Sequence, residues 1–116
     1  MNHQKEISLA EQNFLAFIQE RRQIRESEWT LLRTCVEPFQ FEDGETILAE
    51  GKIGQFLYFL SEGYVRYFSW VDCEDKTRFF AYPHYFFTAQ NSLHLHAVSR
   101  ETIQAVGTCC GLRIPF

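Results

Sequence analysis

Short apolar runs separated by glycine pairs dominate the pattern between residues 43 and 68. The pairs are Asp43-Gly44, Glu50-Gly51 and Glu62-Gly63. Glycine supplies the positive φ that tight turns require. The runs are mostly β-branched, aromatic or aliphatic, as in strands, and comprise residues 46–49, 56–60 and 64–68. This fairly even spacing predicts a β-meander, the pattern of a small sandwich or barrel.

Helix signals precede the meander. Ser8 and Glu11 fit a capping box, with the serine as N-cap and the glutamate as third helical residue. The apolar residues that follow near one face are Phe14, Leu15, Phe17 and Ile18. Ser27 is the predicted N-cap of a second helix, whose buried stripe comprises Trp29, Leu32 and Val36. Pro38 then ends the helical region.

A hairpin and further strands are predicted after residue 71. Residues 72–76 form an acidic turn, and the strand that follows ends at Pro83, because proline donates no ladder hydrogen bond. The strand pattern lapses from residue 84 to residue 99. It resumes at residues 102–106, Gly107 predicts a turn, and residues 112–114 predict a last short strand.

The order of these elements resembles the cyclic nucleotide-binding domain of Crp/Fnr-type transcription regulators. In that family, two short helices precede a β-roll whose first strands are joined by Gly-Glu and Glu-Gly turns. The resemblance implies a mainly β fold, a double-stranded β-helix (jelly-roll or cupin-like β-roll) with two short N-terminal α-helices. It also implies a single domain over residues 1–116, with the helices in residues 8–37 and the β-roll in residues 38–116.

The same resemblance implies a ligand site where the strand pattern lapses. Family members have a phosphate-binding cassette there, in which a Gly-Glu pair opens a short helix and an arginine follows about a dozen positions later. Arg100 occupies the place of that arginine, whereas Thr88 and Ala89 replace the Gly-Glu pair. Weak or absent affinity for cyclic AMP is therefore predicted. The implied ligand residues are Phe86, Phe87, Thr88, Ala89, Asn91, Ser92, Ser99 and Arg100.

These ligand residues also have structural alternatives. Phe86 and Phe87 suit a flat or apolar ligand, but they also suit the hydrophobic core. Thr88, Asn91 and Ser92 fit an anion site at a helix start, or plain turn and cap positions. Arg100 either binds a ligand phosphate or forms a surface ion pair with Glu101 at the start of a strand.

A metal site is the rival hypothesis for this segment. His94-Leu95-His96 followed by Glu101 resembles the first metal motif of cupins, because alternate strand residues share a face and two imidazoles can then bind Fe, Mn or Zn. The glycine expected before the pair is absent, and no histidine follows Glu101 to form a second motif. Surface or cap histidines are the alternative. We expect neither a metal nor a cofactor, and no catalytic residue.

Composition limits the classes of partner. The formal net charge of −4 over 116 residues argues against unaided nucleic-acid binding, which requires neutralisation of phosphates. No run approaches the ~18 apolar residues of a membrane span, and the polar start is no signal peptide. A cytoplasmic location without membrane contact is expected. Free thiols are expected at Cys35, Cys73, Cys109 and Cys110, which lack Cys-x-x-Cys spacing.

The function that the resemblance implies is effector sensing in a transcription regulator. Its expected partners are a small-molecule effector, at most a weakly bound cyclic nucleotide, and a second copy in a homodimer. Family members continue with a dimerising helix and a helix-turn-helix, so DNA binding would need a C-terminal helix-turn-helix beyond Phe116. The apolar residues 114–116 predict self-association. A cupin-like metal protein or enzyme is the alternative, and a ligandless scaffold is a third hypothesis.

Overall fold

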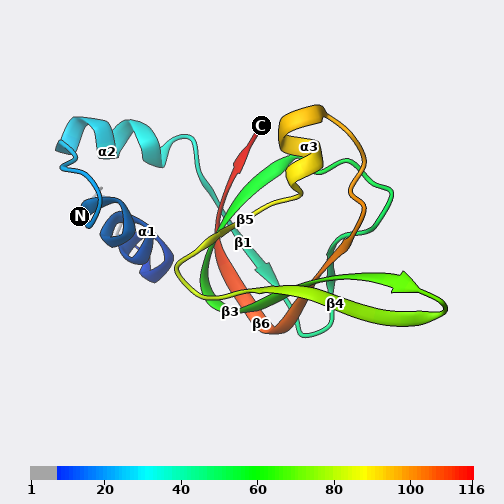
Figure 1. Ribbon diagram of the computed structural model, residues 1–116. Coiled ribbons are helices and arrows are strands. Elements are labelled where there is room, and N and C mark those ends of the chain that lie inside the picture. Colours follow the sequence, from blue (N-terminus) through cyan, green and yellow to red (C-terminus); the bar gives the residue numbers. More distant parts are fainter. Residues whose placement is uncertain (1–7) are drawn as a thin grey trace.

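Residues 8–116 are described by the computed structural model, which shows an antiparallel β-roll preceded by two helices (Figure 1). The helices are α1 (Leu9–Gln19), α2 (Glu26–Arg33) and α3 (Gln90–Leu95). The strands are β1 (Glu37–Phe41), β2 (Thr46–Leu48), β3 (Phe56–Val71), β4 (Glu74–Ala81), β5 (Phe86–Phe87) and β6 (Thr102–Pro115). The predicted mainly β fold with two N-terminal helices is confirmed.

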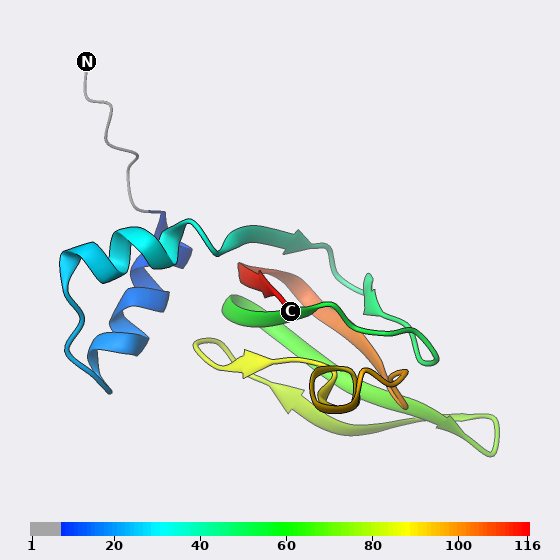
Figure 2. The same cartoon turned by 90° about the horizontal axis from the view of Figure 1, so that it is seen from above.

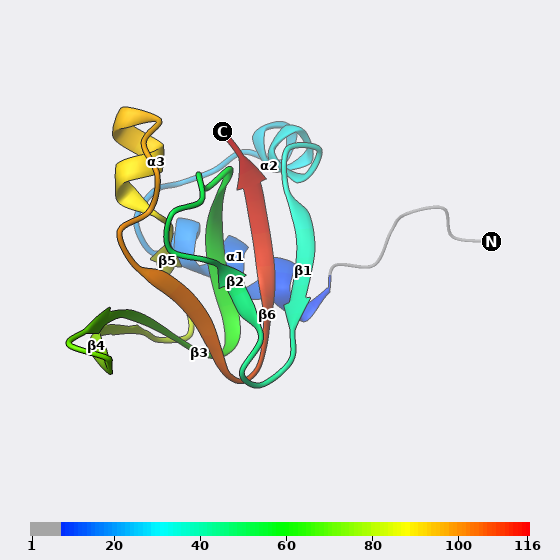
Figure 3. The ribbon, with the colours of Figure 1, turned by 90° about the vertical axis from the view of Figure 1, so that its right-hand side faces the viewer.

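The sheet is built around β3 and β6. Its strand order is β1-β6-β3-β4, with β2 paired to β6 and β5 paired to β3. Every pairing is antiparallel. The N-terminal helices lie on one side of the roll and α3 on another, and the β3–β4 hairpin projects away from both (Figure 2). Figure 3 shows β6 running between β1 and β3 along the roll.

The capping box predicted for the first helix is confirmed. Ser8 Oγ accepts a hydrogen bond from the Glu11 N–H at 3.1 Å, and Glu11 Oε1 accepts one from the Ser8 N–H at 3.2 Å. The N-cap predicted for the second helix is wrong. That helix begins at Glu26 with Arg25 as N-cap, and Glu28 Oε1 accepts from the Arg25 N–H at 3.1 Å. Glu28 therefore satisfies the backbone N–H of the N-cap residue.

Two of the predicted turns are bends within long strands. The turn predicted at Gly63 lies inside β3, where the register against β6 shifts on both sides of Glu62. Gly63 has φ +86°, and a Cβ atom there would lie 2.5 Å from the carbonyl oxygen of Thr108. Gly107, also a predicted turn, has φ +75° within β6. Gly44 and Gly51 are at turns with positive φ, as predicted.

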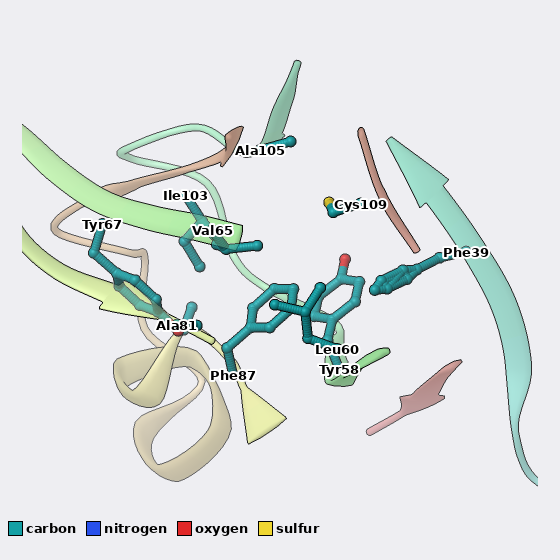
Figure 4. Packing of buried hydrophobic residues seen from close by; sticks show 11 residues of the cluster. Phe39, Tyr58, Leu60, Val65, Tyr67, Ala81, Phe87, Ile103, Ala105 and Cys109 are labelled. Carbon is teal, nitrogen blue, oxygen red and sulfur yellow. The ribbon is translucent and has the colours of Figure 1, made fainter. Parts of the chain in front are cut away.

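The hydrophobic core has two parts. One fills the roll, where Tyr58 and Phe87 stack with their ring centroids 4.7 Å apart (Figure 4). The other lies between the helices and the roll and contains Phe14, Trp29, Phe59 and Leu112. Burial of these side chains attaches the N-terminal helices to the sheet, because each buried aromatic ring contributes roughly 1.5–3 kcal/mol.

Two further observations concern thiols and membranes. All four cysteines are free thiols, as predicted, and burial raises the pKa of Cys109 to about 11. Between residues 8 and 116, no helix is long and apolar enough to cross a membrane.

Replacing Gly63 tests whether the bend in β3 requires glycine. Gly63→Ala should destabilise the protein more than Gly44→Ala. Both glycines have positive φ, but a Cβ atom at Gly44 meets nothing within 4 Å. Gly44→Ala should therefore cost only the left-handed backbone penalty of about 1–2 kcal/mol. Gly63→Ala should cost a further 1–3 kcal/mol or so, because β6 must move. Urea unfolding followed by tryptophan fluorescence measures the free energy of unfolding of both variants. Equal losses of stability would contradict the conclusion that the bend at Gly63 requires glycine.

Candidate functional site

A pocket of about 760 Å³ opens beside α3, within the range of small-molecule sites. Its walls come from β3, β4, β5, α3 and residues 99–101. The short helix that the resemblance implied is present as α3. The pocket includes seven of the eight predicted ligand residues: Phe86, Phe87, Thr88, Ala89, Asn91, Ser99 and Arg100. The predicted segment therefore does surround a cavity.

Ser92 is the predicted residue that the structure does not bring to this pocket. Its hydroxyl accepts a hydrogen bond from the Gly54 N–H at 2.8 Å and donates one to the Ala97 carbonyl at 2.8 Å. The side chain is fully buried. Ser92 therefore links α3 to the loop before β3.

Tyr67 on β3 holds the residue that replaces the family's glycine. Its hydroxyl donates to the Thr88 carbonyl at 2.8 Å and accepts from the Thr88 N–H at 3.0 Å. Thr88 Oγ1 donates in turn to the Phe56 carbonyl at 2.8 Å. Burial raises the pKa of Tyr67 to about 12, so its hydroxyl stays protonated near neutral pH. The amide of Thr88 is thus satisfied from inside the protein.

Arg78 and Glu101 form an ion pair at the pocket. Arg78 Nε and Nη2 each lie 2.7 Å from a Glu101 carboxylate oxygen, which is a bidentate arrangement. Hydrogen bonding to Glu101 raises the pKa of Arg78 further. The alternative in which Arg100 pairs with Glu101 is therefore wrong. Arg100 is exposed at the pocket and has no ion-pair partner among residues 8–116.

Arg78 is a pocket residue that the sequence pattern missed. Tyr67 pairs with Phe79 and Phe68 pairs with Thr77, which leaves Arg78 as an extra residue in a β-bulge. Strict alternation places Arg78 and Phe79 on opposite faces of the strand, yet both line the pocket. A bulge depends on the partner strand, so the local pattern carries no signal for it.

The strand geometry assumed for the metal hypothesis is wrong. His94 lies within α3, and His96 is its C-cap with φ 53°. The two imidazoles therefore do not stand on one face of a strand, and Glu101 is engaged by Arg78. In the described part of the chain, no group of three His, Cys, Asp or Glu side chains lies close enough to hold a metal ion.

Comparison by sequence finds no match, either to protein-family models or to curated proteins. Comparison by structure finds several. The regulatory domain of Toxoplasma gondii PKA with cAMP matches with a TM-score of 0.69 and 19% identity, over 90% of this chain and 39% of that chain. The catabolite activator protein of Thermus thermophilus matches with a TM-score of 0.67 and 22% identity, over 79% and 43%.

A third match contains a ligand without a phosphate. It is the regulatory subunit of a cAMP-independent protein kinase A from Trypanosoma cruzi bound to guanosine. Its TM-score is 0.68 and its identity 18%, over 79% of this chain and 33% of that chain. The chain thus spans less than half the length of each of these three proteins. The chain has the fold of a cyclic nucleotide-binding regulatory domain, and the predicted resemblance is confirmed at that level.

Removing the Tyr67 hydroxyl tests its contact with Thr88. Tyr67→Phe should lower the free energy of unfolding by about 1–3 kcal/mol, because it leaves a buried N–H without a partner. Tyr64→Phe is the matched control. Tyr64 is 47% exposed and its hydroxyl has no hydrogen bond within residues 8–116, so its loss should change little. Urea unfolding gives the stabilities, and faster hydrogen exchange at the Thr88 amide should accompany Tyr67→Phe alone.

Proposed function

We propose that this chain is the effector-sensing domain of a Crp/Fnr-like transcription regulator and binds its ligand between α3 and the roll. The observation that carries this function is the pocket beside α3, which is lined by Arg100, a residue without an ion-pair partner within residues 8–116. Arginine forms strong, charge-assisted hydrogen bonds to phosphate and carboxylate groups. The ligand is therefore anionic, and Arg100 is its charged contact.

Cyclic AMP binds weakly at most under this proposal. No carboxylate lies between residues 83 and 99 to accept the ribose hydroxyl, and loss of one such bond weakens binding by roughly one to two decades. The Thr88 amide is already bonded to Tyr67 and is not free for a phosphate. The guanosine complex of the Trypanosoma cruzi protein is an example of this fold with a ligand other than cyclic AMP.

The wider architecture is also part of the proposal. Residues 1–116 act as one domain, which forms a homodimer in the cytoplasm and reaches DNA only through a helix-turn-helix outside these residues. Ligand binding then biases the arrangement of the two subunits, as a population shift between two states. No catalytic residue is assigned.

An NMR titration tests the site even at low affinity. Cyclic AMP added to the ¹⁵N-labelled chain should give millimolar binding, with amide shifts concentrated in residues 86–101. Arg100→Ala should weaken binding about tenfold or more, because it removes a charged contact. Arg22→Ala is the control, since Arg22 is also exposed and has no ion pair in the described residues.

The outcomes separate the parts of the proposal. Submicromolar binding of cyclic AMP that is lost in Arg100→Ala would support the proposed site and contradict the predicted weak affinity. Binding that Arg100→Ala leaves unchanged would overturn the site. Shifts outside residues 86–101, or none up to about 10 mM ligand, would favour the ligandless scaffold instead.

A further inference from the structure

The walls of the pocket beside α3 combine an apolar part with polar and charged side chains. The apolar part comprises residues of β3, β4, β5 and α3, namely Leu57, Tyr67, Phe79, Phe87 and Leu93. Aromatic walls favour flat ligands, because rings stack or meet edge to face. The apolar part of the wall therefore suits a flat, apolar body.

Several hydroxyl groups of the pocket are already committed within the protein. Those of Tyr67 and Thr88 donate to backbone carbonyls, as described above. The Ser99 hydroxyl donates to the Glu101 carbonyl at 2.6 Å. These three hydroxyls therefore offer a ligand no free donor, and its polar contacts are left to Arg100 and to the remaining polar side chains, Ser69, Gln90, Asn91 and His94.

The charges of the pocket leave one unpaired cation. Arg78 and Glu101 neutralise each other, whereas Arg100 has no ion-pair partner within residues 8–116. Glu101 follows Arg100 directly in the chain, and its carboxylate lines the same pocket at 21% exposure. A ligand with one negative charge is attracted by Arg100. A second negative charge would find the donors of Arg78 already engaged by Glu101.

We propose that this pocket selects a monoanion with a flat apolar body, such as an aromatic carboxylate, and that Glu101 excludes dianions by engaging Arg78. The inference rests on the function proposed above, since both concern one pocket. It names the ligand class and a residue that determines specificity. Arg100 binds the carboxylate of the ligand, and the aromatic walls cover its flat body. Glu101 determines how many negative charges the ligand can carry.

Three related probes separate charge from shape. They share one ring system and are 2-naphthoate, neutral 2-naphthamide and 2-naphthyl phosphate, which is a dianion at about pH 8. On the unmodified chain, calorimetry should show 2-naphthoate binding about tenfold or more tighter than either of the others. Arg100→Gln should remove the difference in affinity between 2-naphthoate and 2-naphthamide. The control Arg22→Gln should preserve this difference.

Substitution of Glu101 tests the exclusion of dianions. Glu101→Gln removes a negative charge and frees Arg78, so affinity for 2-naphthyl phosphate should rise about tenfold or more. Affinity for 2-naphthamide should not change, which shows that the pocket keeps its shape. If circular dichroism shows that this variant does not fold, Arg78→Gln replaces it. Glu101 is then unpaired and competes for Arg100, so 2-naphthoate should bind about tenfold more weakly.

The result that overturns this inference differs from the result that overturns the proposed function. Equal binding of 2-naphthoate and 2-naphthamide to the unmodified chain would overturn it, as would a Glu101→Gln variant that still rejects the phosphate. Cyclic AMP binding that depends on Arg100, without binding of 2-naphthoate, would refute the aromatic monoanion and leave the proposed function standing. If no probe binds in a manner that depends on Arg100, both fail.

Discussion

Burial of both faces of β3 is the constraint on which the rest of the structure depends. Phe59 is 1% exposed and faces the helices, where its ring centroid lies 5.2 Å from that of Phe14 and 5.6 Å from that of Phe17. The next residue, Leu60, is fully buried inside the roll. Since neighbouring strand residues point to opposite faces, one strand holds both the helices and the roll. A register slip of one residue would exchange Phe59 and Leu60 and disrupt both clusters. Gly111 on β6 permits this pairing, because a Cβ atom there would collide with the Phe59 carbonyl.

The same strand positions the candidate site. Farther along β3, Tyr67 holds Thr88 through two hydrogen bonds, and the bulge opposite it brings Arg78 to the pocket. The candidate ligand residues on the segment after β5 are thus supported by a strand buried among aromatic side chains. This arrangement is common in binding proteins, where a rigid scaffold carries variable loops. It explains how the fold persists although the Gly-Glu pair of the cassette is absent.

Local signals predicted the fold well, and contacts between distant segments decided what they missed. The Ser8–Glu11 capping box involves neighbouring residues only, and the Asp43-Gly44 pair is itself a turn signal, so the sequence reveals both directly. The bend at Gly63 depends on β6, and the bulge at Arg78 depends on β3. Similarly, the spacing of His94 and His96 fits one face of a strand, but His94 lies in a helix and His96 is its C-cap. For the site, the segment and Arg100 were predictable, but the partner of Glu101 was not, because it lies 23 residues away.

Internal satisfaction of polar groups bears on how the proposed sensor would work. In a cassette whose amides await a phosphate, an empty site leaves donors without partners, and ligand binding supplies them. Here Tyr67 satisfies the Thr88 amide and Arg78 neutralises Glu101 without any ligand. These two groups therefore need no ligand to be satisfied, and under the proposed function a ligand gains affinity from Arg100, the apolar part of the wall and the remaining polar side chains. A ligand shifts a conformational equilibrium only by the difference in its affinity for the two states. We expect that difference to come from movement of residues 99–101 relative to the β3–β4 hairpin, to which the Arg78–Glu101 ion pair joins them. A dianion that drew Arg78 away from Glu101 would break this link, whereas a monoanion bound by Arg100 would leave it intact.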